Sequence, residues 1–191
     1  MQLTVQGKQI DIGDALRTHV TDHMEDLNEK YFGRATDSTV TFSREGSAFY
    51  KVQISIHIGK NITAQAHATD KDPYVTFDSA SAKLAKQLRR YKRKLRDHHE
   101  RADDKYAEAY DYTISLEEDK GEILKQDPVI VAEMVTNIQT MSVSEAVMRM
   151  DLSGQSAILF RNTQNNGLNM VYRRNDGNIG WVDPDANIAT A

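Results

Sequence analysis

The residues with the clearest chemistry are cations gathered in one stretch, KLAKQLRRYKRKLR, at positions 83–96. Eight of its fourteen residues are Lys or Arg, and no Asp or Glu interrupts them. Ammonium and guanidinium groups bind phosphate oxygens, so the stretch predicts contact with a polyanion. On a helix without such a partner, like charges three and four residues apart would repel by roughly 0.2 to 0.5 kcal/mol per pair. We therefore favour a nucleic-acid interface over a solvated charged surface.

The apolar residues of this stretch predict a helix that presents the cations. At about 100° per residue, Leu84, Leu88, Tyr91 and Leu95 form one narrow stripe. The stripe would pack on a core and turn the opposite side toward solvent. The candidate RNA-binding cations on that side are Lys83, Lys86, Arg89, Arg90, Lys92, Arg93, Lys94 and Arg96.

The histidines offer a second kind of chemistry. His19 and His23 lie four residues apart on the first predicted helix and could share a metal ion. The sequence places no Asp or Glu from another element beside them as a third ligand, so we interpret them as exposed helical histidines. No nucleophile elbow, phosphate-cradling glycine loop or acid pair at catalytic spacing is found in the sequence. We predict no enzymatic activity, no metal, no cofactor and no small-molecule substrate.

Charge divides the chain in two. Residues 1–101 carry 17 Lys and Arg against 13 Asp and Glu, whereas residues 102–191 carry 7 against 15. The overall charge of −4 therefore conceals a basic half that could bind nucleic acid. The chain has no cysteine, and its first residues, MQLTVQGKQ, do not resemble an export signal. We expect a cytoplasmic protein with no membrane partner.

The basic half predicts an α+β domain, residues 1–101, with the order βαβββα. Each of its two helices has one apolar stripe, so both are expected to cover one face of a four-stranded sheet. Asp72-Pro73 opens the basic helix, because proline is tolerated in the first helical turn. The other predicted elements are a strand at 2–6, a helix with a buried face from Leu16 to Tyr31, and an antiparallel meander around Thr41, at 50–58 and at 62–68.

The polar face of this sheet separates two kinds of RNA surface. RNA-recognition motifs stack bases on aromatic side chains that project from their strands. The outward residues here include no aromatic; they are Thr41, Ser43, Gln53, Ser55, His57, Thr63, Gln65 and His67. We therefore assign RNA binding to the basic helix, whose cations would contact phosphates and read RNA shape more than sequence.

The acidic half predicts a linker followed by a small β-rich domain. Residues 102–127 are rich in acids and lack a sustained period, which is typical of an extended linker. Residues 128–191 contain a short helix near Ser142 and strands separated by two hairpin signals, Asn166-Gly167 and Asp176-Gly177.

The strands of this second domain are apolar on both faces. Ile158 and Phe160 point one way and Leu159 the other. A domain of about sixty residues has a marginal core, and oligomerisation is a common remedy. We expect one face to be buried within the chain and the other against a second copy.

Two motifs point to a family. DPYVTFD at 72–78, followed by QLRRYK at 87–92, resembles the second helix of bacterial ribosome hibernation promoting factors. FRN at 160–162 and YRRNDG at 172–177 resemble the C-terminal signature of the long form of that family. The motifs stand in the family's order with an acidic linker between them, so the resemblance covers both predicted domains.

The resemblance implies a stress-induced, non-enzymatic factor that silences ribosomes. In that family the N-terminal domain occupies the mRNA and tRNA channel of the small ribosomal subunit, and the C-terminal domain dimerises and so pairs two ribosomes. Carried onto this chain, Tyr74 would join the basic helix against ribosomal RNA. The homodimer would form through Ile158, Phe160, Met170, Tyr172 and Trp181.

Two alternatives stay open at this point. The chain could be a homodimeric interaction protein whose basic helix binds an acidic protein partner. It could also be a nuclease or another RNA-modifying enzyme, although no catalytic constellation supports this. The salt dependence of binding separates RNA from a protein partner, because phosphate contacts weaken steeply with salt.

Overall fold

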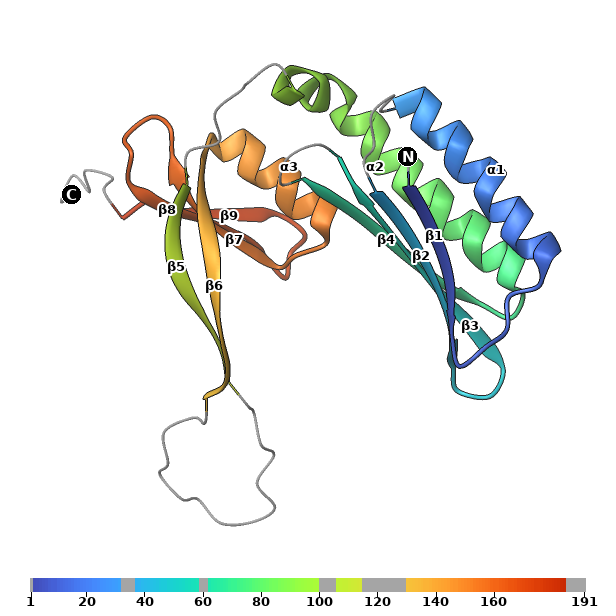
Figure 1. The fold of residues 1–191 in the computed structure, drawn as a ribbon. Helices are drawn as coiled ribbons and strands as arrows, with labels where there is room; N and C mark the ends of the chain where they lie inside the picture. Colours follow the sequence, from blue (N-terminus) through green and yellow to red (C-terminus); the bar gives the residue numbers. More distant parts are fainter. Residues whose placement is uncertain (1, 32–36, 59–61, 100–105, 115–129, 185–191) are drawn as a thin grey trace, which may run out of the picture.

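The computed structural model describes residues 2–31, 37–58, 62–99, 106–114 and 130–184, and at 95–99 only the helical backbone (Figure 1). The first half contains β1 (Gln2–Lys8), α1 (Asp14–Tyr31), β2 (Asp37–Glu45), β3 (Phe49–His57), β4 (Thr63–Asp70) and α2 (Pro73–His99). The predicted order βαβββα is therefore confirmed. The second half contains β5 (Tyr106–Ile114), β6 (Ile130–Met141), α3 (Val143–Ser153), β7 (Ala157–Asn162), β8 (Leu168–Arg173) and β9 (Ile179–Val182).

The first sheet has the strand order β1-β2-β3-β4. The strand β1 pairs with β2 in parallel, because α1 connects the end of one strand to the start of the other. The strands β2, β3 and β4 form the predicted antiparallel meander. Alternate residues of these strands are buried, so the sheet has one apolar face and one polar face.

Both long helices cover the apolar face of the first sheet, and they run parallel to each other (Figure 1). His19 near the start of α1 contacts Asp78 near the start of α2, and Lys92 reaches the backbone oxygen of Lys30 farther along. The shared core includes the predicted stripe residues Leu84, Leu88 and Tyr91 of α2. The fourth predicted stripe residue, Leu95, lies outside the described side chains.

The start of α2 is fixed by a local signal. Asp72 accepts hydrogen bonds at its side-chain Oδ1 from the backbone N–H groups of Tyr74, at 2.7 Å, and Val75, at 3.2 Å. These bonds satisfy two donors that a helix start leaves unpaired, and Pro73 needs no such partner. Among the described helices none, including α2 with its 27 residues, has the apolar length needed to cross a membrane.

The second sheet has the order β5-β6-β7-β8-β9, and its first strand differs from the sequence prediction. Residues 106–114 were expected to belong to the linker but form β5, which pairs antiparallel with β6 along its whole length. Residues 102–105 and 115–127 of the predicted linker lie outside the described residues. The boundaries of the two domains stay a prediction.

The short helix α3 connects the two halves. Ser142 caps it by accepting a hydrogen bond from the backbone N–H of Glu145, and Gly154 ends it in the left-handed conformation at φ 70°. One side of α3 inserts Met148 and Leu152 into the core of the first half. Its other side packs on the second sheet (Figure 1). The two halves therefore share α3 as a common layer.

The core stripe of α2 gives a direct test of this packing. We expect Leu88→Ala to lower the free energy of unfolding by about 2 to 5 kcal/mol, because Leu88 is fully buried and its truncation leaves a cavity. Val75→Ala, on the same helix at 48% exposure, should change it by no more than about 0.5 kcal/mol. Urea denaturation followed by circular dichroism measures both variants, and equal losses would contradict this core.

Candidate nucleic-acid interface

The helix α2 holds its cations on the side away from the sheet. Leu84, Leu88 and Tyr91 anchor one side of the helix in the core, so the residues between them face outward. The described side chains of all the predicted cations are exposed: Lys83, Lys86, Arg89, Arg90, Lys92, Arg93 and Lys94. The side chain of Arg96 lies outside the described residues.

Three of these cations form a row that is open to solvent. Lys86, Arg89 and Arg93 follow each other at spacings of three and four residues, which places them on one helical face. None of the three forms an ion pair with any residue that the structure describes. Their charges are therefore available to an external anion.

The other four described cations are engaged within the chain. Lys83 donates a hydrogen bond from Nζ to the backbone oxygen of His67 at 3.0 Å, and Lys92 donates one to that of Lys30 at 3.2 Å. Lys94 donates to the backbone oxygen of Ser144 in α3 at 3.3 Å and also contacts the Ser144 hydroxyl. Arg90 pairs with Asp151 of α3, at 2.7 Å. The structure thus divides the predicted cations into an open row and an engaged group.

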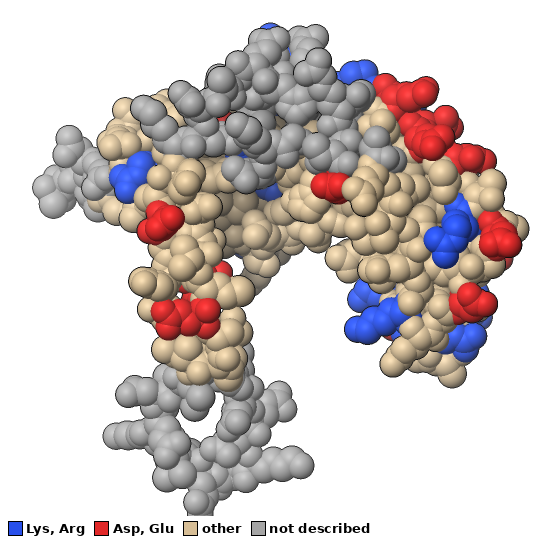
Figure 2. All heavy atoms as spheres, viewed as in Figure 1, with Lys and Arg blue, Asp and Glu red and all other residues tan. Residues whose placement is uncertain are grey.

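The surface beside α2 has the opposite sign. The outer side of α1 carries exposed carboxylates, and Figure 2 shows them gathered over this helix; they are Asp22, Glu25, Asp26 and Glu29. Tyr74 lies at the start of α2 with 39% of its surface exposed and its ring in edge contact with His19. The open cations of this half therefore lie on the α2 side, where the open row and Tyr74 lie on one helix.

Asp151 is the central contact between α2 and α3. Its carboxylate pairs with Arg90 at 2.7 Å and with Arg173 of β8 at 3.0 Å, and it accepts a hydrogen bond from the Tyr91 hydroxyl at 3.0 Å. Gln87 donates a bond to the Asp151 backbone oxygen at 3.3 Å. One acidic residue therefore joins the basic helix, α3 and the second sheet.

These donors keep the Asp151 carboxylate ionised. Burial raises the pKa of Asp151, but the hydrogen bonds from Arg173 and Tyr91 and the charges of Arg90 and Arg173 outweigh burial, so its pKa lies below the ordinary value. Burial is also the first cause of the raised pKa of Tyr91, whose hydroxyl therefore stays protonated and continues to donate. The contact is thus fully formed at neutral pH.

The outer face of the second sheet carries a row of apolar side chains. Strand pairing places Leu159 beside Met170 and Met170 beside Val182, so the three lie across β7, β8 and β9. Leu159 is 50% exposed and Val182 42%. Next to this row the Tyr172 ring lies directly over Gly180, where an added Cβ would fall 2.3 Å from the ring. This outer face therefore has the apolar composition of a buried surface, although none of the described residues covers it.

The structure corrects part of the predicted dimer surface. Phe160 is fully buried in the cluster beneath α3, and Ile158 packs against the same cluster, so both lie on the inner face of the sheet. Trp181 is 51% exposed but projects on the inner side, where its Nε1 donates to Asn169 Oδ1 at 2.8 Å. Met170 and Tyr172 lie on the outer face. Only these two of the five predicted residues belong to the uncovered surface.

The hairpin of β5 and β6 exposes apolar side chains on both of its faces. Tyr110 and Tyr112 of β5 lie on one face with Val135 of β6, whereas Met134 of β6 lies on the opposite face, and all four are 47–65% exposed. Figure 1 shows these two strands extending away from the other three strands of the sheet. A two-stranded hairpin is marginally stable by itself in water, so we expect another protein surface to cover its apolar side chains.

Comparison with known proteins shows what this combination of parts is. Residues 3–96 match the family described as Sigma 54 modulation protein / S30EA ribosomal protein, and residues 125–180 match the family described as its C terminus. A ribosome hibernation promotion factor of Rhizobium meliloti (strain 1021) is 40% identical over 185 residues, covering 96% of this chain and 97% of its own. The chain belongs to the ribosome hibernation promotion factor family.

The chain is also similar to a second curated relative and to a solved structure. The ribosome hibernation promotion factor of Bacillus subtilis (strain 168) is 30% identical over 194 residues, covering 96% of this chain and 99% of its own. A crystal structure of the N-terminal domain of Protein Y from Thermus thermophilus aligns with 48% of this chain and 99% of its own, with a TM-score of 0.43 and 23% identity. In the present chain, β5 lies between the two ranges that match the family descriptions, 3–96 and 125–180.

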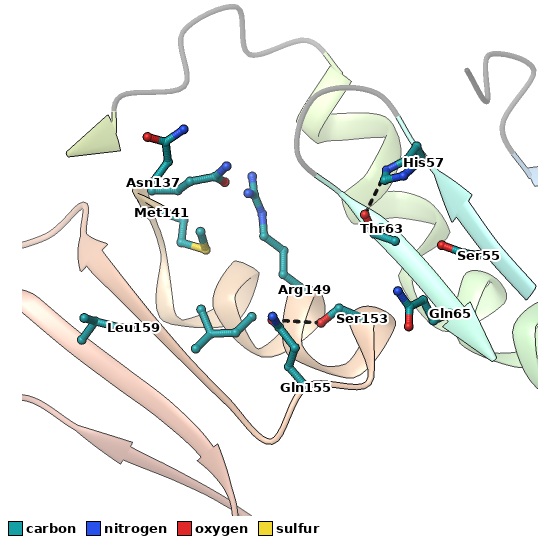
Figure 3. Close-up of a pocket in the computed structure, with 12 residues that line it drawn as sticks. Ser55, His57, Thr63, Gln65, Asn137, Met141, Arg149, Ser153, Gln155 and Leu159 are labelled. Atoms are coloured by element: carbon teal, nitrogen blue, oxygen red, sulfur yellow. Dashed lines mark hydrogen bonds between the residues drawn. The ribbon is translucent and has the colours of Figure 1, made fainter. Parts of the chain in front are cut away.

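A polar hollow lies between the two halves, on the face of the first sheet opposite α1 and α2. It has a volume of about 530 Å³, and Figure 3 shows Ser55, His57 and Gln65 of the first sheet facing Arg149 of α3 across it. His57 hydrogen-bonds Thr63 at 3.0 Å, and Arg149 pairs with Glu145 at 2.9 Å. One wall of this hollow is therefore formed by the polar face of the first sheet.

Sequence reasoning missed the role of α3 at this interface. Asp151 stands alone in the sequence, and nothing in the spacing of Arg90 or Tyr91 indicates a carboxylate about sixty positions away. The signal that could have been used is the apolar pattern of α3. Met148 and Leu152 lie four residues apart, while Ala146 and Met150 form a second buried side, which indicates a helix buried on two sides.

Asp151 predicts a pH-dependent contact between the two halves. Because its pKa is lowered in the folded state, its contribution is present above the ordinary unfolded value of about 3.9 and is lost as the pH falls through the lowered folded value. We expect Asp151→Asn to cost about 1 to 3 kcal/mol at neutral pH. The difference from the unsubstituted chain should vanish in acid, as measured by urea denaturation at each pH.

Asp22→Asn is the matched control, because Asp22 is an exposed carboxylate on α1. It should change the stability by no more than about 0.5 kcal/mol at neutral pH. Hydrogen exchange should also show faster opening of α3 in Asp151→Asn and unchanged exchange in the control. An Asp151→Asn chain as stable as the control at neutral pH would contradict the assigned contact.

Proposed function

We propose that this chain is a non-enzymatic factor that binds ribosomal RNA in the mRNA and tRNA channel of the small ribosomal subunit and blocks translation there. The observation that carries the proposal is the open row of Lys86, Arg89 and Arg93 on α2, which forms no ion pair with a described residue. The names of its relatives, ribosome hibernation promotion factors, support a ribosomal polyanion as the partner.

The chemistry of the open row fits a structured RNA. Arginine and lysine neutralise phosphates and release condensed counterions, which supplies affinity without reading bases. Tyr74, exposed on the same helix, adds an aromatic surface on which a base or ribose can pack. The helix therefore recognises the shape and charge of the channel rather than a sequence, as a general inhibitor of translation requires.

Salt dependence tests the open row. The triple variant Lys86→Ala, Arg89→Ala and Arg93→Ala should bind purified small subunits more weakly, since three phosphate contacts are lost. The slope of log affinity against log salt should fall by about three, or about one for each cation. Cosedimentation with small subunits over a range of salt concentrations measures both quantities.

Arg174→Ala serves as the control for a cation outside α2, because Arg174 is exposed in the turn after β8 and pairs with Asp176 at 3.0 Å. It should leave the slope unchanged. A triple variant that keeps the full slope would place the RNA contact elsewhere, and a chain that does not cosediment with small subunits at any salt concentration would refute the proposal.

The C-terminal part joins two copies in this proposal and so pairs two ribosomes. Its support is the outer apolar face of β7, β8 and β9 together with the exposed apolar faces of the β5–β6 hairpin. Leu159, Met170, Tyr172 and Val182 would meet their counterparts in a second copy. A symmetric dimer buries one patch against itself, so a single apolar face is sufficient.

Leu159→Asp tests this interface. Leu159 is half-exposed in the single chain, so the variant should fold, but a carboxylate buried at an apolar interface costs several kcal/mol. We expect a single-copy mass by light scattering, loss of paired ribosomes in sucrose gradients, and unchanged binding to small subunits. Thr163→Asp, in the exposed turn after β7, should stay dimeric. A Leu159→Asp chain that is still dimeric would show that the interface lies on another surface.

A further inference from the structure

Three potential metal ligands meet where α1 and α2 begin. His19 and His23 project from successive turns of α1, and Asp78 projects from the second turn of α2. One ligand atom from each residue lies within 4.8 Å of the others. No third ligand for the two histidines is evident in the sequence, because only the parallel packing of the helices brings Asp78 to them.

The His23 ring is already oriented as a ligand. Its Nδ1 lies 3.1 Å from the backbone oxygen of His19. A carbonyl oxygen only accepts hydrogen bonds, so Nδ1 is the donor of this bond, and Nε2 is the ring nitrogen left for a metal ion. Histidines that bind metals in proteins commonly donate their other ring nitrogen to a carbonyl in this way.

The pair of His19 and Asp78 supplies the other two donors. His19 Nε2 lies 2.8 Å from Asp78 Oδ1, so its N–H donates a hydrogen bond to the carboxylate. A divalent cation at this position would replace that proton and be bound by both atoms. The imidazole nitrogen and the carboxylate oxygen are then held by different helices, as in a site that cross-links two elements.

Packing restrains the site on its inner side and leaves the outer side open. The buried Phe77 ring lies 5.7 Å from the His19 ring and 5.9 Å from the His23 ring, in edge contact with both. The side chains of His19 and Asp78 are 27% and 51% exposed. An ion can therefore enter from solvent, and a water molecule can complete its coordination.

We infer that His19, His23 and Asp78 form a binding site for one divalent transition-metal ion of the zinc class. Two imidazoles and one carboxylate suit Zn²⁺, which takes four ligands and accepts water as the last. Mg²⁺ and Ca²⁺ prefer oxygen ligands and fit this donor set poorly. The ion would join α1 to α2 and add positive charge close to Tyr74, without taking part in the RNA contact of the open row.

Zinc titration of the full chain tests the site. After dialysis against a chelator, the chain should bind about one Zn²⁺ in a calorimetric titration, and zinc should raise its melting temperature, because the ion binds only the folded state. Cobalt(II) in place of zinc should give the intense visible absorption of a four-coordinate site. His23→Gln and Asp78→Asn should each weaken zinc binding by at least about tenfold.

The controls separate this site from other histidines. His57→Gln removes a histidine that bonds Thr63 on the polar sheet face, and the double variant His98→Gln and His99→Gln removes the pair at the end of α2. Both should bind zinc like the unsubstituted chain. Thermal melting without zinc verifies that His23→Gln and Asp78→Asn still fold. If one of them does not fold, the zinc affinity of the other variant tests the site.

Two outcomes would overturn the inference. One is a chain that binds no zinc, which would leave the three residues as a hydrogen-bonded cluster of the fold. The other is zinc binding that survives both His23→Gln and Asp78→Asn, which would place the ion elsewhere. Neither outcome affects binding to small subunits, which is measured separately.

Discussion

The burial of α3 between the two halves is the constraint on which the rest of the structure depends. Met148 and Leu152 complete the core under α2, while Ala146 and Met150 complete the core under the second sheet. The Asp151 carboxylate then ties this helix to Arg90 and Tyr91. Because a partly buried carboxylate is stable only with its donors in place, the hydrophobic contact and the ionic contact require the same position of α3.

This arrangement determines which cations of α2 are available. Arg90 and Lys94 face α3 and are engaged by it, whereas Lys86, Arg89 and Arg93 point away from it. The open row is therefore the set of described cations on the basic helix that are not engaged by other described residues. Placing the second half beside α2 thus determines which side of the helix stays open to an external anion, as well as joining the halves.

The sequence predicted what local patterns determine. The stripe of Leu84 and Leu88 and the alternation of Phe160 with Leu159 follow from periodicity, and the helix start at Asp72-Pro73 follows from the tolerance for proline in the first turn; the structure has all three as expected. The choice of which face of β7 is buried depends on α3, so Phe160 was assigned to the wrong side. Periodicity fixes the alternation of a strand but not the layer that covers it.

The remaining differences concern contacts between distant parts of the chain. Asp78 reaches the histidines of α1 only because the two helices run parallel, and Asp151 reaches Arg90 only because α3 folds back. Strand β5 was missed for a different reason. Its tyrosines at 106, 110 and 112 alternate as in a strand, but the acids between them were read as a linker composition.

The uncovered hairpin of β5 and β6 has a consequence for how the chain responds to its own abundance. If a second copy covers Tyr110 and Val135, ordering of this hairpin is a bimolecular event governed by mass action. Halving the amount of protein would then reduce the paired form by more than half in the dilute range. The cellular level of the chain would act as a threshold, so that few ribosomes pair until enough copies have accumulated.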